Sequence, residues 1–507
     1  MLELENKQIL VIGLGGRGQA ACEFLQRSGA KVVGVDHANS HNLRRGADRL
    51  RPLGIEVALG VSAPPEREFS LAILSSALPA NQPLVEAVLR SKVPLISELE
   101  LGFQQSRCLS IAIAGTNGKG TTAELVERVL ANNHRQTVLS GHRARPVCSV
   151  IEQTKDLDYL ILQIDSFQLE ITDVLRPSVA VLTNLAPDHL DRYGSVEAYV
   201  RANARLFRNQ QALDWAIVQS ETLTLLRELN LPVPAKLITF SAEDRNADLY
   251  LDRGLLLSRI PNWSGPLLDM QHCQLRGPHN AENLMAALAV SHALRLPLEA
   301  VVDPMKTYTA GPHRFELVAE INGVQFINDS KATNVDALRK TIRATRPGPR
   351  GEPNLWLIAG GKDKGLEFHD VGPLLSKRVK RAFLMGEASE RICAAWSLFT
   401  PCTVAGSLLE AVAEAAKNAT SGDVVLLAPA CSSWDQFRNH QHRGEVFCQA
   451  VKSIGRGVRG GTPNINGKTV TAQQRNEKHE NFAPGFFEGK PRSEANKFNQ
   501  FLNRQTQ

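Results

Sequence analysis

A glycine-rich turn between an apolar segment and a helical pattern constrains this chain more than any other feature. Residues 109–114 are apolar and suit a buried strand, and residues 123–131 suit a helix. The turn between them comprises Gly115, Thr116, Asn117, Gly118, Lys119, Gly120, Thr121 and Thr122. In such a turn, backbone N–H groups and the helix dipole face a phosphate, a lysine adds charge, and a hydroxyl can hold Mg²⁺. The sequence therefore predicts a nucleotide-phosphate site in an α/β domain.

Length and composition indicate a multidomain globular protein. A chain of 507 residues should form two to four domains. It carries no apolar run of about 18 residues and no secretory leader pattern, so we expect no membrane insertion and a cytoplasmic location. The eight cysteines form no Cys-x-x-Cys pair, so neither a zinc site nor a redox motif is predicted.

The positive charge of the chain is concentrated at its C-terminal end. The formal net charge is +6, and residues 456–507 hold nine Lys or Arg against four Glu, which leaves about +1 for the rest. This segment is rich in Gly, Asn, Gln and Pro and has almost no aliphatic periodicity. We expect a disordered tail, because such a segment buries too little apolar surface to offset the entropy of ordering. A basic tail is not a basic groove, so nucleic acid is not an expected partner.

The first of three α/β segments, residues 1–108, opens with a dinucleotide-like pattern. A strand is expected over 8–12, a helix over 19–28 and a strand over 31–35 that ends at Asp36. The turn at 13–18 has the Gly-x-Gly-x-x-Gly spacing, and Asp36 follows at the distance at which an acidic residue binds a ribose. Taken alone, this pattern leaves an NAD site open.

The other two segments also alternate strands with helices, which predicts parallel sheets. In residues 109–310 we expect strands over 109–114, 159–164 and 179–184 and a helix over 281–294. In residues 311–455 we expect strands over 324–328, 354–359 and 424–427 and a helix over 408–418.

Several motifs resemble the Mur ligases, and in particular the members that add D-glutamate. The glycine-rich turn resembles that of the superfamily, and its Gly-Lys-Gly-Thr order is also similar to that of folylpolyglutamate synthases. The remaining motifs lie in family order over about residues 7–455: 167–170, 184–192, 279–283, 312–316, 328–334, 360–365 and 429–437. The resemblance implies three domains, Rossmann-like, P-loop ATPase-like and Rossmann-like, followed by the tail.

The resemblance also implies an activity and a set of site residues. It implies an ATP- and Mg²⁺-dependent monomer that joins D-glutamate to UDP-N-acetylmuramoyl-L-alanine through an acyl phosphate. The implied catalytic residues are Lys119, His189 and Lys331. Besides the turn 115–122, ATP would contact Asn280, Asn283, Arg314 and Asp329, and the metal would contact Thr121, His189 and Asp165. The implied substrate-binding residues are Gly15, Arg17, Asp36, Ser75, Thr333, Lys364 and Ser433, with Asp36 facing the uracil.

The chain departs from the family pattern around the second metal and the acyl acceptor. Gln163 replaces a metal-binding glutamate, Asn203 replaces a lysine that is carbamylated, and residues 142–144 replace Asn-Ile-Gly. Asp165 lies on the same strand face as Gln163 and could supply the missing carboxylate. Arg205 or Arg143 could neutralise phosphate instead of a metal. Three alternatives to the ligase remain open: a nucleotide-binding homologue with impaired catalysis, a folylpolyglutamate-type ligase, and an NAD-binding protein.

Overall fold

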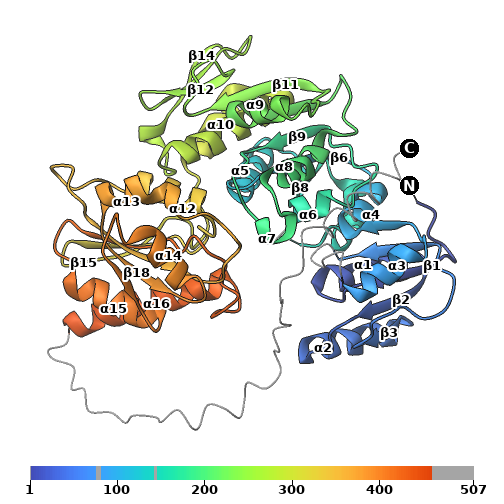
Figure 1. The fold of residues 1–507 in the computed structure, drawn as a ribbon. Helices are drawn as coiled ribbons and strands as arrows, with labels where there is room; N and C mark the ends of the chain where they lie inside the picture. The colour runs from blue at the N-terminus through green and yellow to red at the C-terminus, as the bar shows by residue number, and fades with distance from the viewer. Residues whose placement is uncertain (1, 76–81, 142–144, 460–507) are drawn as a thin grey trace, which may run out of the picture.

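The computed structural model describes residues 2–75, 82–141 and 145–459, and its strands form three separate sheets. Figure 1 shows these sheets in three lobes, with the central lobe in contact with both of the others. The expected α/β class and three-part architecture are confirmed. The described residues include no helix that is both long and apolar enough to cross a bilayer.

The N-terminal sheet is parallel, with the order β3-β2-β1-β4-β5. Its strands are β1 (Gln8–Ile12), β2 (Lys31–Asp36), β3 (Glu56–Leu59), β4 (Leu71–Leu74) and β5 (Leu95–Ser97). Its helices are α1 (Gly16–Arg27), α2 (His41–Leu50), α3 (Pro83–Arg90) and α4 (Glu98–Gln105). Strands β2 and β3 are added on one side of β1, and β4 and β5 on the other. The loops after the adjacent strands β1 and β4 therefore lead away in opposite directions and leave a crevice between them, as in Rossmann-like folds.

The central sheet has the order β14-β13-β12-β11-β10-β9-β6-β8-β7, and only β12–β14 pair antiparallel. Its strands are β6 (Leu109–Ala114), β7 (Thr137–Gly141), β8 (Tyr159–Gln163), β9 (Val179–Leu182), β10 (Trp215–Gln219), β11 (Lys236–Ser241), β12 (Leu249–Asp252), β13 (Leu255–Ser258) and β14 (Gly265–Asp269). Its helices are α5 (Lys119–Asn132), α6 (Ser166–Leu169), α7 (Leu190–Tyr193), α8 (Val196–Ala204), α9 (Ser220–Glu228), α10 (Pro278–Ala293) and α11 (Leu298–Lys306). Because β6 lies between β9 and β8, the segments that follow these three strands meet at one edge.

The C-terminal sheet has the order β15-β16-β20-β17-β18-β19, with only β15 antiparallel. Its strands are β15 (Glu316–Ile321), β16 (Val324–Asn328), β17 (Leu355–Gly360), β18 (Val379–Met385), β19 (Cys402–Val404) and β20 (Val424–Leu427). Its helices are α12 (Val335–Ala344), α13 (Gly372–Arg378), α14 (Ser389–Trp396), α15 (Leu408–Asn418) and α16 (His440–Arg459). The loops after the adjacent strands β16, β20 and β17 contain the three motifs expected to bind D-glutamate.

Most of the expected elements are present, with differences at their ends. The expected strands 8–12, 109–114, 324–328 and 424–427 and the helix 408–418 have the expected bounds. Helix α5 begins at Lys119, four residues earlier than expected, because the glycine-rich turn leads directly into it. Helix α16 extends to Arg459, past the expected start of the tail at 456, and the rest of the tail lies outside the described residues.

The buried apolar residues join the first two domains and leave the third with cores of its own. One cluster runs from Leu4 and Val11 in the N-terminal domain through Val147 to Leu226 in the central domain. The C-terminal domain has two separate clusters, one on each side of its sheet, and only the partly buried Leu190 of the central domain packs against either of them. Among the described residues, the contact between the central and C-terminal domains is therefore mostly polar.

Candidate active site

The glycine-rich turn after β6 has the backbone geometry of a phosphate loop. Gly115 and Gly118 have φ angles of +125° and +88°, in the region that favours glycine. A Cβ atom on Gly115 would lie 2.3 Å from Thr183 Oγ1, so a side chain would also be excluded sterically. Gly118 is the residue before the first turn of α5, and the N-terminus of that helix therefore points into the loop.

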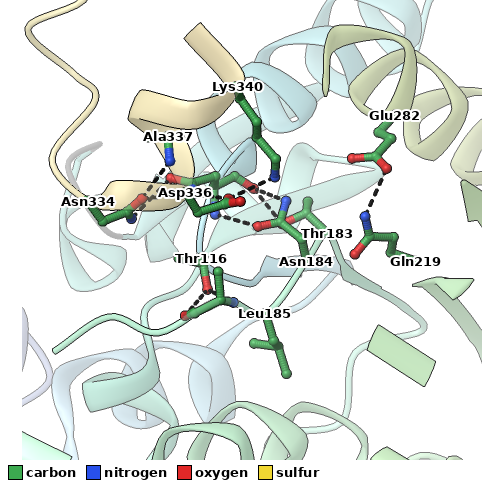
Figure 2. Close-up of polar contacts among 12 residues, drawn as sticks. Thr116, Thr183, Asn184, Leu185, Gln219, Glu282, Asn334, Asp336, Ala337 and Lys340 are labelled. Carbon is green, nitrogen blue, oxygen red and sulfur yellow. Dashed lines mark hydrogen bonds and ion pairs between the residues drawn. The ribbon is translucent and has the colours of Figure 1, made fainter. Parts of the chain in front are cut away.

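The residues that follow β9 hold this loop in place, as Figure 2 shows. The Asn184 side chain accepts a hydrogen bond from Asn117 N at 3.0 Å and donates one to Asn117 O at 2.9 Å. Thr183 Oγ1 donates to the same carbonyl at 2.7 Å, and Thr116 N donates to Asn184 O at 2.7 Å. The loop is therefore fixed by its neighbours without using the Asn117 side chain.

Lys119 lies against Asp165, as the ordering of β6 and β8 predicts. Its Nζ donates to Gly115 O at 2.6 Å and lies 3.2 Å from Asp165 Oδ1, and both side chains are largely buried. The Asp165 carboxylate also caps the short helix α6. Two of the residues expected to act on phosphate and metal are thus brought together in one ion pair.

The two candidate metal-binding hydroxyls have different surroundings. Thr122 is fully buried, and its hydroxyl donates to Asn283 Oδ1 at 3.3 Å. Thr121 lines the pocket described below, and its Oγ1 accepts from Arg314 Nη1 at 2.9 Å. A Cβ atom on Gly120 would lie 2.6 Å from Arg314 Nη2, so the glycine gives this arginine room to approach. Thr121 is therefore the better placed of the two hydroxyls.

A solvent-open pocket of about 670 Å³ lies between the central and C-terminal domains. Its lining includes most of the residues expected on the nucleotide side: Asn117, Gly118, Thr121, Asn280, Asn283, Arg314, Asp329 and Lys331. Burial raises the pKa of Asp329 to about 6, although Thr341 donates a hydrogen bond to its carboxylate. Seven of the sequence-predicted ATP residues, from both domains, therefore face one space, whereas Lys119 is not part of its lining.

His189 begins the short helix α7 with a φ angle of +54°. Its ring packs edge-on against Phe167 at 4.7 Å between centroids. Burial lowers the pKa of His189, although Asp188 opposes this effect. The imidazole is therefore neutral near pH 7, which is the form that binds metals.

The residues expected to bind D-glutamate come from three loops. Lys364, after β17, donates to Asp188 Oδ1 of the central domain at 3.0 Å, and both side chains are largely buried. Thr333, after β16, is half-buried and precedes Asn334, the N-cap of α12. Ser433, after β20, is buried, and its carbonyl accepts from Phe437 N at 2.8 Å.

A fully buried arginine, which the sequence analysis did not identify, connects two of these loops. Arg443 of α16 donates to Ser330 Oγ at 3.0 Å, to Ser330 O at 2.9 Å and to Cys431 O at 3.1 Å. Ser330 Oγ in turn donates to His440 O at 2.7 Å. Arg443 thus fixes the segment that carries Lys331 relative to the segment that carries Ser433.

The N-terminal domain positions its expected substrate residues around β1. Gly15 precedes α1, and Ser75 N donates to Ile12 O at 2.9 Å. The buried Asp36 carboxylate accepts from Leu14 N at 2.7 Å and from Ala38 N at 2.9 Å, so it braces the glycine turn. Arg17 lies near the buried Glu98, where its charge partly opposes the rise in pKa that burial causes. Ser76 and Ala77 lie outside the described residues.

The residues that depart from the family pattern form a poor second metal site. Asn203 is completely buried, its Nδ2 donates to Tyr199 O at 2.9 Å, and its Oδ1 has no hydrogen-bond partner within the described parts of the chain. Gln163 is buried at the end of β8. Arg205 donates to Leu169 O and Thr172 O, which makes it a brace for the turn after α6 rather than a phosphate ligand. Residues 142–144 lie outside the described residues.

One cluster has the donor types of a metal site but is held by hydrogen bonds. The ligand atoms of His313, Glu316 and Cys448 lie within 4.8 Å of one another. Asn328 Nδ2 donates to His313 Nδ1 at 2.8 Å and lies within hydrogen-bond distance of the other two. Its Oδ1 accepts from Ser330 N at 3.1 Å, which fixes the amide with its donor towards the cluster. An N–H group in that position opposes a cation, so the cluster orients His313 and its neighbour Arg314.

Two family models match most of the chain. The Mur ligase middle domain matches residues 113–291, and the Mur ligase glutamate ligase domain matches residues 313–431. Among solved structures, the Thermotoga maritima MurF ligase in complex with ADP has a TM-score of 0.58 at 16% identity, and covers 90% of this chain and 100% of its own. The UDP-N-acetylmuramate–alanine ligase of the same organism has a TM-score of 0.56 at 17% identity, with 89% and 100% covered. These likenesses establish the fold.

Curated relatives are more similar in sequence. The UDP-N-acetylmuramoylalanine–D-glutamate ligase of Acidobacterium capsulatum is 38% identical over 457 residues, covering 89% of this chain and 97% of its own. The proteins of the same name from Koribacter versatilis and Geobacillus kaustophilus are each 35% identical, covering 89% of this chain and 99% and 98% of their own. The chain therefore belongs to the Mur ligase family, in the branch of the UDP-N-acetylmuramoylalanine–D-glutamate ligases.

Proposed function

We propose that this chain is an ATP-dependent ligase that adds D-glutamate to UDP-N-acetylmuramoyl-L-alanine in peptidoglycan synthesis. The names of its relatives support this reaction. The observation that carries the proposal is the meeting of two half-sites at one interface. The phosphate loop of the central domain and the Lys331 loop of the C-terminal domain line one pocket, and Lys364 contacts Asp188 beside it.

The proposed chemistry follows from the weakness of a carboxylate as an electrophile. Transfer of the γ-phosphoryl group to the L-alanine carboxylate gives an acyl phosphate and ADP. The D-glutamate amine then attacks the acyl carbon, phosphate leaves, and an amide forms. In such a reaction the protein contributes chiefly positioning and charge neutralisation. Lys119 and Lys331 would bind phosphate oxygens, and Lys364, Thr333 and Ser433 would hold the D-glutamate carboxylates.

One Mg²⁺ ion fits the residues present better than two. Thr121 faces the pocket, Asp165 supplies a carboxylate and His189 is neutral, which are donors that a magnesium–nucleotide complex can use. The bound ion would neutralise phosphate charge. A second ion would depend on Gln163 and the enclosed Asn203, which bring no negative charge.

The division of labour among domains follows the three sheets. We propose that residues 1–108 bind the UDP moiety through Gly15, Arg17 and Ser75 around a turn that Asp36 braces. Residues 109–310 would bind ATP, and residues 311–455 would bind D-glutamate. A cytoplasmic monomer that acts on these small molecules, and not on nucleic acid, remains the expectation.

Incubation of the full chain with ATP, Mg²⁺, UDP-N-acetylmuramoyl-L-alanine and labelled D-glutamate tests this proposal. We expect the label to appear in a UDP-N-acetylmuramoyl-dipeptide, with one phosphate released per product. Omission of UDP-N-acetylmuramoyl-L-alanine or of D-glutamate should abolish both product formation and phosphate release. Incorporation into a folate but not into the UDP substrate would instead identify a folylpolyglutamate-type ligase. Nucleotide binding without any product would favour the second candidate, a homologue with impaired catalysis, which the uncharged, buried Gln163 and Asn203 favour.

A further inference from the structure

The side chain of Asn117 leaves the phosphate loop and bonds to the C-terminal domain. Its Nδ2 donates to Asn334 Oδ1 at 3.2 Å, and Asn334 Nδ2 donates back to Asn117 Oδ1 at 3.3 Å. Asn117 Nδ2 also donates to Asp336 Oδ2 at 2.8 Å, and Lys340 pairs with that carboxylate at 2.9 Å. In Figure 2 the Asn334–Lys340 segment lies over the end of β9 that holds the loop. The two asparagines therefore form a reciprocal amide pair across the domain interface.

The same amide pair continues to the lysine expected to bind D-glutamate. The second N–H of the Asn334 amide donates to Asp188 Oδ2 at 3.0 Å, and Asp188 Oδ1 accepts from Lys364 Nζ at 3.0 Å. Asn334 and Asp188 are both buried. A single chain of hydrogen bonds thus runs from the phosphate loop through Asn334 and Asp188 to Lys364.

The arrangement leaves Lys364 available to a ligand while fixing its direction. An ammonium group has three N–H donors, of which Asp188 accepts one. The remaining donors can bind the carboxylates of an amino acid. Asn334 uses both of its amide N–H groups and also accepts from Ala337 N at 2.8 Å, so it has no freedom to rotate without losing several bonds. Its position depends on Asn117.

We propose that the Asn117–Asn334 amide pair is the contact through which nucleotide in the phosphate loop sets the affinity of the C-terminal domain for D-glutamate. This inference rests on the proposed function. In this proposal Asn117 and Asn334 act as positioning residues through the bonds between their side chains, which hold Asp188 and Lys364 in register with the loop. The two domains share no continuous apolar core among the described residues. Arg314 also bonds to Thr121 and Glu124 across the interface, but the described bonds that run from the phosphate loop on to Lys364 pass through Asn334 and Asp188. Coupling of this kind is reciprocal, so D-glutamate should also tighten nucleotide binding.

Two substitutions remove the pair and spare the local folds. Asn117→Ala should leave the loop intact, because Thr183 and Asn184 hold the Asn117 backbone. Asn334→Ser removes both amide donors but keeps an acceptor for the N-cap of α12, at which serine is as good as asparagine. Asn418→Ala is the matched control, because Asn418 is exposed on α15 and bonds only to the carbonyl of Glu414 in its own helix.

The measurement is the apparent KM for D-glutamate at low and at saturating ATP, for both single variants, the double variant and the control. In the wild type and in Asn418→Ala, saturating ATP should lower this KM by about 5-fold or more, the usual lower range of site–site coupling. In both single variants the KM should be high and independent of ATP, and the double variant should resemble either single one. Thermal unfolding should be unchanged in Asn117→Ala, and ADP affinity, measured without D-glutamate, should be unchanged in Asn334→Ser.

The outcomes separate this inference from the proposed function. If the wild type makes no product, the proposed function fails. If the wild type makes product, and the KM for D-glutamate depends on ATP as strongly in Asn117→Ala and Asn334→Ser as it does in the wild type, the inference fails while the function stands. Additive losses in the double variant would likewise overturn it, because a single shared contact can be lost only once.

Discussion

Replacement of the buried Arg443 by methionine should destabilise the C-terminal domain more than the same replacement of an exposed arginine. The guanidinium is completely buried and donates to Ser330 O at 2.9 Å and to Cys431 O at 3.1 Å. It also donates to Ser432 O at 3.3 Å. Methionine fills a similar volume but donates nothing, so all three carbonyls lose a donor from a charged group. Each buried acceptor left unpaired costs about 1–3 kcal/mol, and loss of the desolvation cost of the buried charge offsets part of that sum.

We therefore expect a loss of about 3–4 kcal/mol in the free energy of unfolding of this domain. For a domain of about 150 residues, each kcal/mol shifts the melting temperature by roughly 2–4 °C, so the transition should fall by about 6–16 °C. Differential scanning calorimetry is the suitable measurement, because a three-domain chain need not unfold in one transition. Arg438→Met is the matched control, because Arg438 is an exposed arginine close to Arg443 in the chain.

The same substitution should also weaken D-glutamate binding, because Arg443 joins the loops that carry Lys331 and Ser433. At a temperature well below unfolding, the KM for D-glutamate should rise and the KM for ATP should change little. A free energy of unfolding within about 1 kcal/mol of the wild-type value would refute this reasoning. It would mean that water replaces the arginine at the three carbonyls and that other contacts set the positions of the loops.

Three further predictions concern the nucleotide side. Lys119→Ala should abolish ATP binding by calorimetry while leaving the circular dichroism spectrum unchanged, because the lysine lies at the loop and not in an apolar core; unchanged affinity would contradict this. Asp329→Asn should raise the melting temperature relative to wild type more at pH 7.5 than at pH 4. The pKa of Asp329 is about 6 in the folded protein, so the wild type becomes less stable as the pH rises from about 3.8 to 6. The amide of the variant does not titrate. Equal differences at both pH values would exclude that cause. Gln163→Glu combined with Asn203→Lys should raise ligase activity and make it bicarbonate-dependent, and a wild type that already matches the double variant would refute a weakened second metal site.

The phosphate loop and its neighbours could be predicted from sequence because local patterns determine them. Long apolar runs predict β6 and β9 as buried strands, and the glycines mark the turn between β6 and α5. The start of α5 was placed four residues too late because Gly120, Thr121 and Thr122 have low helix propensity. In the structure the loop before them ends in a left-handed Gly118, which allows the helix to begin at once.

The contacts between distant segments could not be predicted in this way. Asn117 and Asn334 are 217 positions apart, and each fits a loop or cap without the other. Arg443 was missed because arginine is usually exposed, and only the convergence of two loops on α16 explains its burial. That Asp36 faces a base stays a prediction. Its bond to Leu14 N also could not be predicted from the sequence, because it depends on how the turn folds back towards the end of β2.

The charges around Lys119 indicate how this chain could work with an altered second metal site. Asp165 is the carboxylate that lies against Lys119, at 3.2 Å, and it comes from the strand end that also carries Gln163. Asn203 is fully buried, and its Nδ2 donates to Tyr199 O at 2.9 Å, so a neutral packed amide stands where the family pattern has a charged ligand. If the enzyme turns over, the negative charge that its metal needs must come mainly from Asp165 and from the substrate phosphates. The same carboxylate also pairs with Lys119, so Asp165→Asn should weaken both the position of Lys119 and any metal binding.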